Sequence, residues 1–350
     1  MNFHLRPLSL VYGPDARRAI EARQGGALGG SPFIAFTQAE LIERNGGRIS
    51  RHVVSYAEAG MHQEQLDLIE RPRPDFAGLS MGRPKLMGIV NVTPDSFSDG
   101  GLLAGPNEAI AHGLTLAGEG ADILDIGGES TRPGSDAVPA AAELERILPV
   151  IEALAAQGHC ASVDTRKALV MTAAVKAGAA IINDVSALTY DAASPATAAG
   201  LGTPVILMHA KGDPKTMQDN PVYDDVTLDV FDMLAERITQ CEAAGIPRER
   251  IAIDPGIGFG KTFRHNLTLL SQLTLFHGLG VVLLVGLSRK AFTGVLTGEK
   301  KAADRVFGSV GGAVQAALNG AQILRIHDVK ATRQALAVAL AAVDPEASGP

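Results

Sequence analysis

The 350-residue sequence has few of the features that mark secreted scaffolds, membrane proteins or nucleic-acid-binding proteins. It contains two cysteines, no tryptophan and only 4% aromatic residues. Two cysteines cannot build the disulfide framework of a secreted scaffold, and we expect Cys160 and Cys241 to be buried apolar side chains. No segment approaches the roughly 18 consecutive apolar residues of a membrane span. The net charge of −7 and the scattered basic residues argue against a surface for nucleic acid or anionic membrane.

The bulk composition favours one large domain with an additional segment. Hydrophobic residues make up 46% of the chain, which is enough for a sizeable core. The first 20 residues lack the apolar region of a secretory signal, so we expect a cytoplasmic protein. Because the basic residues are scattered, we expect any anionic ligand to bind a local site rather than an extended basic surface.

Eight short apolar runs recur between residues 85 and 330, and each ends in a polar or glycine-rich tail. The runs are LMGIVN (86–91), ADILDIGG (121–128), CASVD (160–164), AIIND (180–184), PVILMH (204–209), IAIDPG (251–256), VVLLVG (281–286) and AQILRIH (321–327). Continuous apolarity is typical of parallel strands buried on both faces, and the intervening segments have helical spacing. We therefore predict an α/β fold, a (β/α)₈ TIM barrel over residues 85–345 with an additional amino-terminal segment.

Residues 1–84 have a different character and no recognisable reactive cluster. Glycines crowd residues 25–30, and the prolines of RPRPDF (71–76) favour a linker. Short helices are predicted at 38–45 and 58–70, and a strand at 50–56. We place the domain boundary before Lys85 and treat the preceding residues as an extension of unknown role.

The ends of the predicted strands carry short polar side chains. Strands three, four and six end in Asp164, Asn183 and Asp254, which should meet at the mouth of the barrel. A carboxylate and an amide match the donors and acceptor on the edge of an amino-pyrimidinone heterocycle. A carboxylate metal site and strand-end capping are the alternatives. Asp125 and His209 also lie at strand ends, where a structural role is as plausible as a functional one.

Strands seven and eight end in a cationic group made of Ser288, Lys290, Arg325 and His327. The loops after these strands are the recurrent phosphate site of this fold, and alternation puts Arg325 and His327 on one face. Surface ion pairing, with Asp328 for example, is the alternative. This corner predicts a phosphate-bearing ligand.

Three loops add further candidate residues. GIVNVTPDSFSDGG (88–101) is longer than a usual strand-to-helix connection and resembles a lid. GGESTRPG (127–134) presents Thr131, Arg132 and Pro133 from a stiff turn. DPGIGFGK (254–261) fails the phosphate-loop pattern because Pro255 stands where its first glycine is required. Its glycines instead allow close approach to a ligand, with Phe259 offering an apolar face.

Taken together, these motifs resemble those of dihydropteroate synthases. They are NVTPDSFSDGG, GGESTRPG, SVDTR, IINDV, LMHAKGDPKTMQ, DPGIGFGK, SRKAF and RIHDV, in this order over about residues 85–330. Ile257 departs from the pattern, because a second phenylalanine is common in the family at that position. The resemblance implies a transferase of folate biosynthesis. Its reaction joins 4-aminobenzoate to 6-hydroxymethyl-7,8-dihydropterin diphosphate and releases pyrophosphate.

The resemblance also implies roles for single residues. The pterin ring would be held by Asp164, Asn183, Asp254 and Lys290. The diphosphate would be held by Asn91, Arg325 and His327, with Asn91 also reaching a Mg²⁺ ion. The aminobenzoate would be surrounded by Thr131, Arg132, Pro133, Phe259 and Ser288, while Phe97 and Asp99 arrive with the first loop. The family implies a homodimer formed through barrel helices.

Elementary chemistry agrees with that assignment. A carbon–oxygen bond to diphosphate breaks most easily when Mg²⁺, Arg325 and His327 neutralise the leaving group, and Asp99 can stabilise the developing cation. We therefore count Asp99, Lys290, Arg325 and His327 as catalytic and expect the pterin diphosphate to bind first. A pterin-dependent methyltransferase and a catalytically silent pterin sensor remain as rival interpretations.

Overall fold

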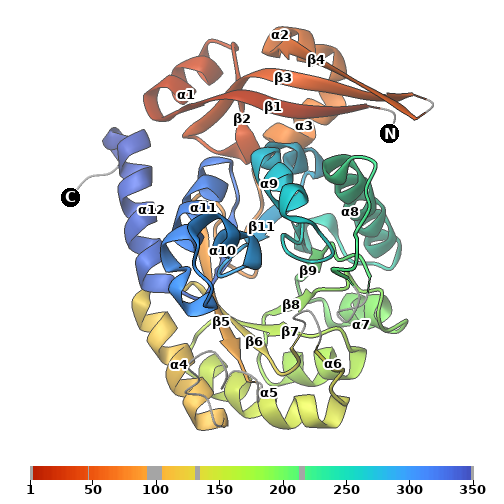
Figure 1. The fold of residues 1–350 in the computed structure, drawn as a ribbon, viewed down its shortest axis with the longest axis vertical. Coiled ribbons are helices and arrows are strands. Elements are labelled where there is room, and N and C mark those ends of the chain that lie inside the picture. Colours follow the sequence, from red (N-terminus) through yellow and green to blue (C-terminus); the bar gives the residue numbers. More distant parts are fainter. Residues whose placement is uncertain (1–2, 46, 93–104, 131–134, 213–216, 348–350) are drawn as a thin grey trace.

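Eight parallel strands form a closed barrel, which confirms the predicted fold class (Figure 1). The structure is a computed structural model that describes residues 3–45, 47–92, 105–130, 135–212 and 217–347. The barrel strands are β5 (Lys85–Asn91), β6 (Ile123–Gly127), β7 (Ala161–Asp164), β8 (Ile181–Asp184), β9 (Val205–Met208), β10 (Ile251–Asp254), β11 (Val282–Gly286) and β12 (Ile323–Ile326). Each pairs with the next along the chain, and β12 pairs with β5 to close the ring.

Helices surround the barrel and bury one face against it. They are α4 (Pro106–Glu119), α5 (Ala140–Ala155), α6 (Ala168–Lys176), α7 (Ser194–Leu201), α8 (Val226–Ala243), α9 (Phe263–Ser271), α10 (Ala291–Thr297), α11 (Val306–Leu318) and α12 (Val329–Val343). Strand residues such as Ile126 and Val163 pack with helix residues such as Ile147 and Leu234 in the main core. None of the helices in the described ranges combines the length and apolarity of a bilayer crossing.

A second apolar cluster fills the amino-terminal end of the barrel. Phe76 and Met81, from the segment that precedes β5, pack against Met87, Ile123 and Val282. Phe76 is completely buried. The segment predicted to be a linker is thus the plug that closes the bottom of the barrel.

Ahead of this plug, residues 3–70 form a small antiparallel sheet with helices, which we call the amino-terminal unit. Its elements are β1 (Phe3–Tyr12), α1 (Gly13–Glu21), β2 (Gly26–Ala27), β3 (Ile34–Asn45), β4 (Arg48–Ser55), α2 (Tyr56–Ala59) and α3 (Gln63–Glu70). β3 lies between β1 on one side and both β2 and β4 on the other. The unit packs beside the barrel near α8, α9, α11 and α12 (Figure 1).

The predicted helix at 38–45 is wrong, because these residues belong to the long strand β3. Ala39, Leu41 and Glu43 have good helix propensity, but pairing with β1 and β4 along most of the strand outweighs it. The predicted helix at 58–70 is divided by a 3-10 turn at Gly60–His62 into α2 and α3. The strand predicted at 50–56 corresponds to β4.

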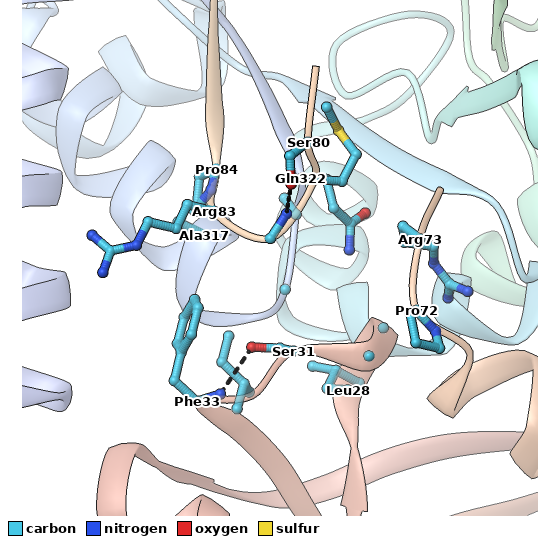
Figure 2. Close-up of a pocket in the computed structure, with 17 residues that line it drawn as sticks. Leu28, Ser31, Phe33, Pro72, Arg73, Ser80, Arg83, Pro84, Ala317 and Gln322 are labelled. Carbon is cyan, nitrogen blue, oxygen red and sulfur yellow. Dashed lines mark hydrogen bonds between the residues drawn. The ribbon is translucent and has the colours of Figure 1, made fainter. Parts of the chain in front are cut away.

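A cavity of about 180 Å³ separates the amino-terminal unit from the bottom of the barrel (Figure 2). Leu28, Ser31 and Phe33 line one side, and Arg73 and Gln322 line the other. Gln322 directly precedes β12, so this cavity lies at the amino ends of the strands. It is therefore at the opposite end from the predicted mouth.

Candidate active site

The carboxyl ends of the strands bring most of the described candidate residues into one ring. In the strand register, Asn91 pairs with Gly127, Gly127 with Asp164, and Asp164 with Asn183. On the adjacent strands β11 and β12, Gly286 pairs with Arg325. A side chain at Gly127 would meet both Asn91 and Asp164 within 3.7 Å, so these two polar groups lie above the same glycine.

Arg325 is the centre of this ring. Its Nε lies 2.6 Å from Asp125 Oδ2, and its Nη2 lies 2.7 Å from Asp164 Oδ2. Asn183 Nδ2 donates to the same Asp125 oxygen over 3.1 Å. Asp125, which the sequence left open between structure and function, therefore joins the arginine to the amide and is completely buried.

Burial changes the ionisation of the two candidate aspartates. It raises the pKa of Asp164 to about 7, against the attraction of Arg325. It raises the pKa of Asp254 to about 6, although a hydrogen bond from Gly256 N–H and the charge of Lys290 both lower it. The paired carboxylates raise the pKa of Arg325, which stays charged. Two acids that titrate close to neutral pH thus face one permanent cation.

The loop after β10 carries Asp254 and Phe259 to the mouth. Asp254 Oδ1 accepts a 2.7 Å hydrogen bond from Gly256 N–H. Lys290 Nζ lies 3.8 Å from the centre of the Phe259 ring, a cation–π contact. Gly258 has φ +89°, and a Cβ there would lie 2.9 Å from Lys290 Cδ, so only glycine allows this approach.

Ser288 and His327 form a second pair at the ends of β11 and β12. Ser288 Oγ lies 3.0 Å from His327 Nδ1 and accepts from His327 N–H. Asp328 pairs with Arg289 rather than with Arg325. Surface ion pairing therefore explains Arg289, whereas Arg325 turns inward.

Lys261 is a buried cation that sequence reasoning did not select. Only 3% of it is exposed, and its Nζ donates to the carbonyl oxygens of Gly256 and Phe259 over 2.8 and 3.0 Å. The same atom lies 2.9 Å from His209 Nδ1. Burial lowers the pKa of Lys261 to about 7 and that of His209 to about 3, so the imidazole is neutral and accepts. The failed phosphate-loop pattern gave no sign of this role.

Glu129, for which the sequence predicts pairing with backbone groups or cations, is the centre of another group. Arg166 and Lys167 both bind its carboxylate, and Lys167 also binds the buried Glu143. Val138 N–H donates to Glu129 as well. These contacts tie the loops after β6 and β7 together and leave Glu129 no capacity for a ligand.

Five candidate residues fall outside the described part of the chain. They are Phe97, Asp99, Thr131, Arg132 and Pro133. The described candidates are Asn91, Asp164, Asn183, Asp254, Phe259, Ser288, Lys290, Arg325 and His327, and all lie at or just after the carboxyl ends of barrel strands.

Comparisons with known proteins point in one direction. Residues 87–327 match the family described as "Pterin binding enzyme". Dihydropteroate synthase of Escherichia coli K12 is 48% identical over 261 residues, covering 74% of this chain and 92% of that protein. The synthase of Neisseria meningitidis serogroup B is 49% identical over 265 residues, covering 74% and 93%. The amino-terminal unit lies outside the residues matched to the family.

Solved structures give the same result. Xanthomonas albilineans dihydropteroate synthase with 4-aminobenzoic acid is 53% identical, with a TM-score of 0.72 over 77% of this chain and 98% of that one. The same enzyme in complex with 7,8-dihydropteroate is 50% identical, with a TM-score of 0.70 and the same coverage.

Proposed function

The chain belongs to the dihydropteroate synthase family of pterin-binding enzymes, and we propose how its barrel mouth performs that family's reaction. The enzyme is a transferase that condenses 4-aminobenzoate with 6-hydroxymethyl-7,8-dihydropterin diphosphate, releasing pyrophosphate and forming 7,8-dihydropteroate. The observation that supports this function most directly is the buried ring of Asp125, Asp164, Asn183 and Arg325. It lies in a chain half identical to a synthase solved with 7,8-dihydropteroate.

In this proposal the ring edge of the pterin pairs with Asp164, Asn183 and Asp254. All three side chains are at least nine-tenths buried, so an unmatched donor there would be costly. Lys290, already positioned against Phe259, reaches the same heterocycle from the other side. The aminobenzoate then lies beside Phe259 and Ser288. We assign Thr131, Arg132 and Pro133, which are outside the described residues, to the same substrate.

The diphosphate leaves toward the cationic side of the mouth. Arg325 and His327 supply donors to the leaving oxygens, and Asn91 supplies an amide on the neighbouring strand. Asp99 and Phe97 belong to the first loop, outside the described residues, and we assign to the Asp99 carboxylate the stabilisation of the developing methylene cation. The diphosphate leaves before the weakly basic arylamine attacks, so no strong general base is needed. The pterin diphosphate binds before 4-aminobenzoate.

The described donor set fits a magnesium ion that arrives with the substrate. The described residues contain no group of three or more His, Cys, Asp or Glu able to hold a metal. Mg²⁺ commonly keeps several waters and binds substrate phosphates through only one or two protein ligands. Asn91 would be its protein ligand here, and the ion would supply neutralising charge to the leaving diphosphate.

Chelation should separate this metal role from pterin binding. Removing divalent cations with EDTA should lower pyrophosphate release by roughly 100-fold or more, and added Mg²⁺ should restore it. Calorimetry should show weaker binding of the pterin diphosphate but unchanged binding of the pterin lacking diphosphate. Equal loss for both ligands would contradict a metal confined to the diphosphate.

The function itself is tested with the full-length protein, Mg²⁺ and the two substrates. Chromatography should detect dihydropteroate and pyrophosphate in equal amounts. Binding of the diphosphate without any product would instead favour a pterin sensor. Product formation that requires a methylated folate would favour the methyltransferase.

We also propose a cytoplasmic homodimer formed through barrel helices. The helices α10 and α11 expose Val295, Leu296 and Phe307, and Phe307 is 89% exposed. Large apolar side chains that gather on neighbouring helices are typical of subunit contacts. Light scattering should give twice the mass of the chain.

A further inference from the structure

We propose that the amino-terminal unit positions the rim of the active site, through two arginines on β3 and β4 that hold the start of α8. Nothing in the family match covers this unit, because the match begins at residue 87. The inference rests on the proposed function, since it concerns the same mouth. It assigns Arg44 and Arg51 as positioning residues rather than catalytic ones.

The contact between these arginines and α8 is a network of ion pairs. Arg44 binds Asp229 and Asp232, each over 2.9 Å. Arg51 binds Asp225 over 2.5 Å and, with its other nitrogen, Glu40 over 2.9 Å. Several shared charges in one network hold geometry better than an isolated surface pair.

The same carboxylates shape the turn from which α8 begins. Asp225 Oδ1 accepts from the N–H groups of Thr227 and Leu228, while its other oxygen binds Arg51. Asp229 Oδ2 accepts from Asp224 N–H over 2.9 Å, while its other oxygen binds Arg44. Each arginine thus holds a carboxylate that itself accepts from backbone N–H groups between residues 224 and 228. We call residues 222–228 the entry segment.

The entry segment lies at the mouth side of the barrel. α8 follows β9, so its first residues stand at the carboxyl ends of the strands. The cavity of Figure 2 lies at the other end, where the same amino-terminal unit contacts the residues before β12. The unit therefore spans the side of the barrel from its bottom to its rim.

From the entry segment, contacts continue directly to the ligand loops. Tyr223 Oη donates to Gly260 O over 2.7 Å, and the Tyr223 ring packs edge-on against His265 with centroids 5.0 Å apart. Gly260 lies between Phe259, which contacts Lys290, and Lys261, whose ammonium binds the carbonyls of the same loop. A shift of Tyr223 would therefore move the loop that carries Asp254 and Phe259.

We expect the barrel to fold without the two arginines. Their side chains are 28% and 31% exposed, and their carboxylate partners are 13% to 41% exposed. Glu40, the most buried partner, keeps its ion pair with Arg6, so losing the arginines leaves no deeply buried unpaired charge. The carboxylates at the start of α8 also interact favourably with the helix dipole without a partner. Removing the arginines should loosen the rim and leave the core intact.

The test compares the double variant Arg44→Ala/Arg51→Ala with Arg17→Ala in the full-length protein. Arg17 makes an equivalent contact between the amino-terminal unit and the barrel, with two bonds to Asp344 of 2.9 and 3.1 Å. Because α12 runs from the mouth to the bottom, Asp344 at its end lies far from the rim. Both variants lose ion pairs between the amino-terminal unit and the barrel, but only Arg44 and Arg51 contact the helix that begins at the entry segment.

Steady-state kinetics and hydrogen exchange should distinguish the double variant from Arg17→Ala. We expect the double variant to raise KM for 4-aminobenzoate about threefold to tenfold, the scale of coupling carried by such contact networks. In the double variant, amide exchange in residues 256–265 should accelerate. The single variant Arg51→Lys, which keeps Arg44, should retain most of the wild-type KM and exchange rates. Arg17→Ala should lower the thermal midpoint without either change.

Each outcome has one interpretation. Equal KM and equal exchange in the double variant and in Arg17→Ala would overturn the positioning role. A wild-type protein that forms no dihydropteroate would instead contradict the proposed function, while the exchange comparison would still judge the positioning role.

Discussion

Replacing Arg325 with alanine is expected to damage both stability and catalysis. The change leaves Asp125 and Asp164 side by side in a buried ring without their shared cation. Removing one partner of a buried ion pair typically costs about 3–5 kcal/mol of the free energy of unfolding. Since the same guanidinium would meet the leaving diphosphate, kcat/KM should fall by roughly 1,000-fold.

Arg325→Lys separates these two effects. Lysine keeps the positive charge but cannot reach both carboxylates with a rigid fork, so much of the stability should return and little of the activity. Urea unfolding would measure the free energy, and pyrophosphate release would measure kcat/KM. Full activity in Arg325→Lys would show that charge alone suffices and that the paired geometry is unimportant.

The partners of Arg325 show where sequence reasoning stopped. Alternation along RIHDV predicted that Arg325 and His327 share a face, and the fold predicted a cationic corner. The pairing of Arg325 with Asp125 and Asp164 depends on side chains reaching across a closed ring of strands. Because these residues are 200 and 161 positions away, no local pattern encodes that contact. We therefore expect Arg325→Ala to weaken pterin binding as well as diphosphate binding.

The barrel and the amino-terminal unit differ in how well the sequence predicted them. Barrel strands such as LMGIVN at β5 are buried on both faces, so their apolar runs are unambiguous. β3 mixes buried and half-exposed residues, and its Ala, Glu and Leu suit either structure. Pairing with β1 and β4 decides the outcome, and strand pairing is a non-local contact.

The burial of Lys261 could not be predicted from the sequence for a different reason. A lysine is seldom buried without a carboxylate partner, so sequence gives little reason to select one. Here carbonyl oxygens of two loops, together with His209, replace the carboxylate. Those acceptors converge only because positive φ angles at Gly256 and Gly260 fold the loop back on itself. The glycines were visible in the sequence, but the cation they surround was not.

Asp164→Asn is expected to remove most pterin affinity while leaving the fold intact. Arg325 keeps its bond to Asp125, so the variant creates no unpaired buried charge. The amide replaces one acceptor oxygen with an NH₂ donor, which would face a donor of the heterocycle, so the dissociation constant should rise by roughly 100-fold or more. Calorimetry would measure binding and circular dichroism the fold. A variant that unfolds would indicate a structural role for Asp164 instead.

The pH dependence of the same variant gives a sharper test. With a pKa of about 7, Asp164 carries a proton at pH 6 that must leave when the carboxylate accepts hydrogen bonds from the pterin. Wild-type affinity should therefore strengthen as pH rises toward 7, by at most about tenfold per pH unit, and level off above it.

The free energy of unfolding of the unliganded protein should decrease as pH rises, whereas the pterin affinity increases. The folded state keeps the Asp164 proton that the unfolded chain loses near pH 4, so the free energy of unfolding falls between about pH 4 and 7. In Asp164→Asn, neither the pterin affinity nor the free energy of unfolding should show the pH dependence that comes from Asp164. Asp254→Asn should retain the transition of Asp164, because that variant leaves the buried Asp164 carboxyl in place. If Asp254→Asn, and not Asp164→Asn, abolished that transition, the carboxylate that discriminates the pterin would be Asp254.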